Sequence, residues 1–111
     1  MNVDLQAFIS PDRDIGVPGG ALLLAFADAV IGTDRAALDD ARTALAEGLS
    51  PAAVSGASAI AANFSKNDRI ANGVGIPIDE MVMKITGDIR EELGLNDYRS
   101  AFNTFRHGAA E

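Results

Sequence analysis

The sequence contains no cysteine and only one histidine, His107. The absence of cysteine excludes disulfides, thiol nucleophiles, thiolate metal sites and dithiol redox chemistry. With a single histidine, a transition-metal site would have to consist mainly of carboxylates, and the acidic residues do not show the spacing of such a site. We therefore expect neither a bound metal nor a cofactor.

Clusters of basic residues and long apolar runs are also missing. The chain has 9 Lys and Arg residues against 16 Asp and Glu, a formal net charge of −7, and its basic residues are scattered. They could not neutralise a row of phosphates, so nucleic acid is not expected as a partner. No apolar run reaches the roughly 20 residues that span a bilayer, and the start MNVDLQAF is not a secretion signal. These absences predict a soluble, cytoplasmic protein without a membrane segment.

Aromatic residues make up only 5% of the chain, whereas 48% of it is hydrophobic, with many alanines. A core of such small side chains requires close contacts between helices. Helices of this kind often bury enough area only with a second subunit. The composition therefore predicts an all-α fold of four to five helices with orthogonal or bundle-like packing, completed by homo-oligomerisation.

Turn-forming residues concentrate in the first 20 positions, which include Pro11, Pro18 and the Gly-rich piece GVPGG. We expect residues 1–20 to form a flexible arm with at most one short turn of helix. The piece GVPGG does not follow a predicted strand and lacks the G-x-G-x-x-G spacing, which favours a hinge or helix entry over a phosphate-binding loop. Residues 21–108 are predicted to form a single helical domain.

The longest helical pattern lies between Ser50 and Asp79. Ser50 is a suitable N-cap, and Pro51 suits the first helical position. Gly75 can adopt the left-handed conformation that ends a helix, and Pro77 prevents its continuation. At about 100° per residue, one face of this helix is small and apolar. That face comprises Ala53, Ala57, Ile60, Ala61, Phe64, Ala71 and Val74.

Two polar residues, Asn67 and Asp68, interrupt this apolar face. A buried neutral polar group without a partner costs about 1 to 3 kcal/mol, and a charge costs more. Together with Asn63, we take them as candidate ligand-binding residues. The alternative is that they cross-link neighbouring helices through an arginine or backbone groups. No residue is assigned a catalytic role, and none is assigned to a metal.

Two helices are predicted before this long one. Residues 21–31, ALLLAFADAVI, are apolar on nearly all sides, which is typical of a helix with several neighbours. A buried strand is the alternative, although length and alanine content favour the helix. Thr33 or Asp34 can cap the next helix, which is expected to run to about Glu47.

Two more helices are predicted after it. Asp79 can cap a helix that continues through Leu93 and ends at Gly94. Asn96 can cap a last short helix with one apolar side. That side comprises Tyr98, Ala101, Phe102 and Phe105.

The runs AANF (61–64), DRIAN (68–72) and GIP (75–77) resemble the C-terminal helix of alkylhydroperoxidase-like proteins of the carboxymuconolactone decarboxylase superfamily. The likeness covers roughly residues 21–79, since an apolar and an acidic helix precede these runs in the same order. It implies an all-helical fold, oligomers, and peroxide reduction or decarboxylation. The family's helix with Cys-x-x-Cys and a nearby histidine is absent, and Asp68 and Asn72 stand where the family commonly has Asn and Asp. Cysteine-based peroxidase activity is therefore excluded.

Three functions remain open. The sequence favours a non-redox relative of this superfamily that acts as an oligomeric binding or accessory protein rather than as an enzyme. The second is a small enzyme without thiol chemistry, in which Asp68 acts as a base desolvated by its apolar surroundings. The third is a module that binds a protein partner through the apolar sides of residues 21–31 and 98–105.

Overall fold

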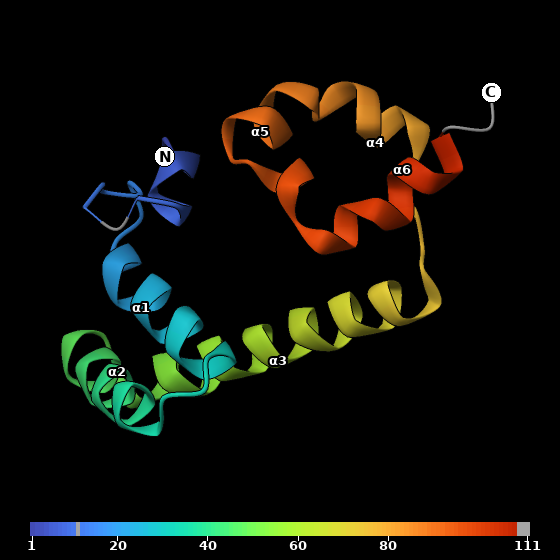
Figure 1. The fold of residues 1–111 in the computed structure, drawn as a ribbon. Helices are drawn as coiled ribbons and strands as arrows, with labels where there is room; N and C mark the ends of the chain where they lie inside the picture. The colour runs from blue at the N-terminus through green and yellow to red at the C-terminus, as the bar shows by residue number, and fades with distance from the viewer. Residues whose placement is uncertain (11, 109–111) are drawn as a thin grey trace. The chain divides into compact units, whose positions relative to one another are not determined.

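A computed structural model describes residues 1–10 and 12–108, and it contains helices but no strand within those residues (Figure 1). This confirms the predicted all-α class. The chain divides into two compact units, Met1–Lys66 and Asn67–Glu111, and the boundary falls inside the long helix α3 (Pro51–Val74). The predicted arm of residues 1–20 belongs to the first unit. That residues 21–108 act as a single domain stays a prediction.

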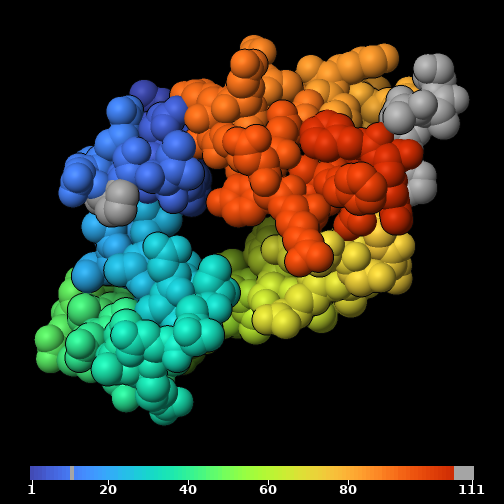
Figure 2. Space-filling view, viewed as in Figure 1, coloured from blue at the N-terminus to red at the C-terminus, as the bar shows by residue number. Residues whose placement is uncertain are grey.

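The first unit begins with a short 3-10 helix, η1 (Leu5–Phe8), whose N-cap is Asp4. The backbone N–H of Asp4 donates to the carbonyl of Ile15 at 3.0 Å, which folds the segment back on itself. Ala7 and Ile15 are buried. Figure 2 shows this segment against the start of the following helix. The N-terminal residues thus contribute to the core of the first unit.

Helices α1 (Gly20–Ile31) and α2 (Arg35–Gly48) lie side by side, joined by a short turn (Figure 1). Asp34 caps α2, because its carboxylate accepts from the backbone N–H groups of residues 36 and 37. Phe26 from α1 and Leu45 from α2 are both buried. A side chain at Gly48 would collide with Leu22, so this glycine permits the close approach of the two helices.

Helix α3 begins and ends as the sequence predicts. The Ser50 hydroxyl accepts from the backbone N–H of Ala53 at 3.1 Å, and Gly75 has a φ of +73°. The helix is about 36 Å long at 1.5 Å per residue. However, none of its residues is buried. The expectation that its apolar face would be buried is wrong. The alanines of that face are half-buried, whereas Ile60, Phe64 and Val74 are exposed.

The second unit contains two short helices, α4 (Glu80–Ile85) and α5 (Gly87–Glu92), where the sequence predicted one. Asp79 caps α4 as expected, since its carboxylate accepts from the N–H of Met81 at 2.8 Å. The interruption lies at Thr86, whose hydroxyl donates to the carbonyl of Val82 at 2.6 Å. Such a bond competes with the helical pattern, and Gly87 adds low helix propensity. The prediction of an unbroken helix over residues 79–93 is therefore wrong.

The end of the second unit consists of η2 (Leu95–Asp97), η3 (Arg99–Ala101) and α6 (Phe102–Gly108). Gly94, with a φ of +64°, ends the preceding helix as predicted. The expected cap at Asn96 is wrong, because its side-chain oxygen accepts from Arg90 instead and the α-helix starts later. Among residues 67–106, none is buried. The fold of this unit is therefore stabilised by polar contacts and by contacts between apolar side chains that stay partly exposed.

Candidate functional site

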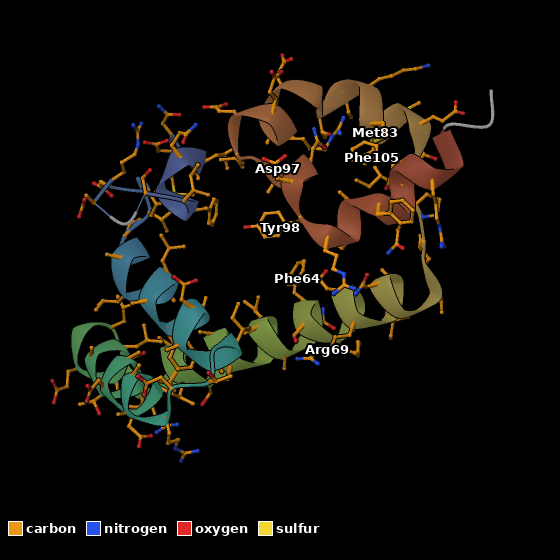
Figure 3. The ribbon with its side chains drawn as sticks, in the orientation of Figure 1. Phe64, Arg69, Met83, Asp97, Tyr98 and Phe105 are labelled. Atoms are coloured by element: carbon orange, nitrogen blue, oxygen red, sulfur yellow. The ribbon has the colours of Figure 1, made fainter. Side chains whose placement is uncertain are left out.

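A hollow of about 510 Å³ lies within the second unit. Its polar lining comes from Asp68, Arg69, Asn72, Arg90, Asn96, Ser100, Asn103 and Thr104. Its apolar lining comes from Ala71, Ile76, Ile78, Met83, Leu95, Ala101 and Phe105. Figure 3 shows Met83 of α4 and Phe105 of α6 on facing sides of this unit. The hollow therefore has both polar and apolar lining residues, as small-molecule sites commonly do.

Arg90 is the central polar residue of this hollow. Its Nε donates to Thr86 Oγ1 at 3.1 Å, its Nη1 to Asn96 Oδ1 at 2.8 Å, and its Nη2 to the carbonyl of Met83 at 2.7 Å. The last bond satisfies a carbonyl that the interruption at Thr86 leaves without its helical partner. A single side chain thus joins α4, α5 and η2.

Two further hydrogen bonds fix α6 within the second unit. Asn103 Nδ2 donates to Asn72 Oδ1 at 3.0 Å, and the backbone N–H of Ile78 donates to Thr104 Oγ1 at 2.9 Å. The first bond joins α6 to the last turns of α3, and the second joins it to the segment that precedes α4. All four residues line the hollow, so the bonds that hold α6 also shape the site.

The three residues predicted to bind a ligand are all exposed. Asp68 lines the hollow of the second unit. Asn63 lies in the first unit, where its Oδ1 accepts from Lys66 Nζ at 3.2 Å, and Asn67 is not part of the lining. The expectation that Asn67 and Asp68 are set into a buried face is wrong, because none of the residues of α3 is buried. Their role as ligand contacts stays a prediction.

Most of the polar residues that line the hollow were not predicted from the sequence to belong to a site. A signal was available for Arg90, because Thr86-Gly87 weakens a helix and an arginine follows one turn later. Asn96 was interpreted as a helix cap, which is the commonest local use of that residue type. Asn103 and Thr104 belong to the site only through contacts with distant residues. Sequence spacing does not reveal such contacts.

Another hollow, of about 670 Å³, lies in the first unit between α1 and α2. Alanines make up much of its lining, with the carboxylates of Asp28, Asp34 and Asp40. In the part of the chain that the structure describes, no group of three or more His, Asp or Glu side chains could hold a metal ion. This hollow offers methyl groups and acidic side chains but no cation.

None of the described helices is both long enough and apolar enough to cross a bilayer. No family model, no curated protein and no solved structure matches the chain.

Proposed function

We propose that this protein is a helical binding or accessory protein that works as a homo-oligomer. The observation that carries this proposal is the exposure of the large side chains on the apolar side of α3. Ile60 and Phe64 lie one turn apart on the same face, and their side chains are 63% and 62% exposed. Contiguous apolar surface of this kind is typical of an interface with another protein. A second copy of the chain supplies the same surface and can cover it symmetrically.

The second unit supports the same proposal. It is close in length to the limit of roughly 40 residues below which disulfides, metals or oligomerisation are usually needed for stability. The sequence has no cysteine, so disulfides cannot supply the missing stability. The large apolar side chains that this unit exposes are Ile70, Val74, Ile76, Ile78, Met81, Val82, Ile85, Ile89, Leu95, Tyr98, Phe102 and Phe105. Covering part of this surface in an assembly would add the apolar burial that the isolated unit lacks.

The sequence likeness to the carboxymuconolactone decarboxylase superfamily adds a second line of support. That likeness implies oligomers, and it rests on the runs AANF (61–64), DRIAN (68–72) and GIP (75–77). We therefore propose that the protein is a cysteine-free relative of this superfamily. We also propose that it is located in the cytoplasm. The alternative of an enzyme that uses Asp68 requires a desolvated carboxylate, whereas Asp68 is exposed.

Size-exclusion chromatography with light scattering tests the assembly. The wild-type chain should elute as a dimer or larger species at micromolar concentration. The double variant Ile60→Glu/Phe64→Glu places two charges on the apolar side of α3 and should shift the population to monomer. The matched variant Ala59→Glu/Ala62→Glu adds the same charge at exposed positions on other sides of the helix and should leave the assembly unchanged. A wild-type chain that stays monomeric would overturn the proposal.

A further inference from the structure

The guanidinium of Arg90 carries a charge that its partners do not neutralise. Its three acceptors are a hydroxyl, an amide oxygen and a backbone carbonyl. In the described part of the chain, no carboxylate is among the partners of Arg90. Fully buried charged groups usually have an opposite charge beside them, whereas Arg90 is half-buried and solvent can still reach it. Arg90 is therefore fixed in position with its charge available to another molecule.

The same guanidinium also keeps unused donors. An arginine has five N–H groups, and three of those of Arg90 are engaged, which leaves one on each terminal nitrogen. A carboxylate is the acceptor that best matches such a guanidinium, because it can take two N–H bonds and neutralise the charge. Asp68 also lines this hollow, but it is not among the partners of Arg90.

The rest of the hollow is suited to an apolar body. Ile76, Ile78, Met83, Leu95 and Phe105 line it. Its volume of about 510 Å³ is within the range of about 300 to 1,000 Å³ that is usual for small-molecule sites. A ligand that matches both kinds of lining residue has one charged end and a body of several carbons.

We propose that this hollow binds a small molecule with one carboxylate and an aliphatic body, and that Arg90 receives the carboxylate. The three hydrogen bonds of Arg90 hold the guanidinium in place before the ligand arrives, which lowers the entropic cost of binding. This inference rests on the binding role proposed above. It does not depend on assembly, because every residue named here belongs to one unit of one chain.

Isothermal titration of the full chain with sodium octanoate and with 1-octanol tests the charge requirement. The two probes have the same number of carbons, and only octanoate carries a carboxylate. Octanoate should bind saturably at one site per chain and at least about tenfold more tightly than octanol, since bonds to charged groups are the stronger ones. Equal affinities, or no saturation with octanoate, would overturn the inference.

Variants locate the site. Ala71→Leu should fill part of the hollow while leaving every hydrogen bond of Arg90 in place, and it should weaken octanoate binding about tenfold or more. Lys84→Gln removes a positive charge from an exposed residue that does not line the hollow, and it should leave the affinity within about twofold. Unchanged binding by Ala71→Leu would contradict the inference, as would an equal loss in both variants.

Light scattering on the same samples separates the two proposals. An oligomer that does not bind octanoate would overturn the inference and leave the assembly standing. A monomer that binds octanoate would overturn the assembly and support the hollow as a site. Arg90→Gln is informative only beside circular dichroism, because its three hydrogen bonds also stabilise the second unit.

Discussion

The side-chain amide of Asn103 donates a hydrogen bond to the side-chain oxygen of Asn72 at 3.0 Å and so joins α6 to the last turns of α3. Both residues line the hollow of the second unit. A double-mutant cycle with Asn72→Ala and Asn103→Ala should give a coupling of about 0.5 to 1 kcal/mol, the net value of a neutral hydrogen bond. Urea unfolding followed by the fluorescence of Tyr98, the single tyrosine of the chain, measures it. Strictly additive losses would show that the two amides do not interact.

Loss of Arg90 should destabilise the second unit far more than loss of a neighbouring arginine. Arg90→Ala removes three hydrogen bonds and leaves the Met83 carbonyl without a partner, which we expect to cost about 2 kcal/mol. Arg99→Ala, at an exposed position, should cost less than about 0.5 kcal/mol. Urea unfolding by Tyr98 fluorescence at one fixed protein concentration compares the two variants. Similar losses would contradict the central position assigned to Arg90.

Replacement of glycine by alanine should change the stability of the protein in opposite directions within α3 and at its end. Gly56 lies in the helix with open space around it, so Gly56→Ala should stabilise the protein by about 0.5 to 1 kcal/mol. Gly75 has a positive φ, and a Cβ there would meet Arg106 Nη2 at 2.5 Å. Gly75→Ala should therefore destabilise by about 1 kcal/mol or more. Thermal unfolding followed by circular dichroism measures both changes in stability. A stabilising effect of Gly75→Ala would refute the assigned helix end.

Low pH should reduce the stability of the folded N-terminal segment, because the carboxylate of Asp4 becomes protonated. This carboxylate accepts from Arg13 Nε at 2.8 Å and lies 2.6 Å from Arg13 Nη2. The hydrogen bond from Arg13 is the main cause that holds the pKa of Asp4 below its usual value, against an opposing effect of desolvation. Because the pKa is lower in the folded state, this stabilisation is present above about pH 4 and is lost as the pH falls below it.

Carbon-13 NMR of the Asp4 carboxyl measures this pKa directly. Arg13→Gln should raise the pKa toward the ordinary value for aspartate. Arg106→Gln removes the same charge at a residue that is not among the causes of the lowered pKa of Asp4, and it should leave that pKa unchanged. A pKa that does not respond to Arg13→Gln would show that the pair does not persist in solution.

Helix ends were the part of the fold that the sequence predicted best. Ser50, Asp34 and Asp79 cap their helices through bonds to N–H groups two or three residues away, and Gly75 ends α3 with a positive φ. These contacts are local, so residue type and spacing are enough to predict them. The all-α class follows from the same local patterns.

Of the residues predicted to bind a ligand, only Asp68 lines the hollow of the second unit. The centre of the hollow depends on Arg90, whose bonds to Met83 and Asn96 form only because the chain breaks at Thr86 and turns back. Helical periodicity also predicted which face of α3 is apolar but not whether anything covers it. Periodicity gives the direction of a side chain, whereas burial depends on the neighbours that folding or assembly supplies.

The lack of buried side chains in residues 67–106 has a thermal consequence. The heat capacity change of unfolding comes mainly from apolar surface that becomes hydrated. A unit that hides little such surface should melt with a small heat capacity change and a broad transition. Unless a partner covers it, its amide protons should exchange with solvent faster than those around Phe26 and Leu45.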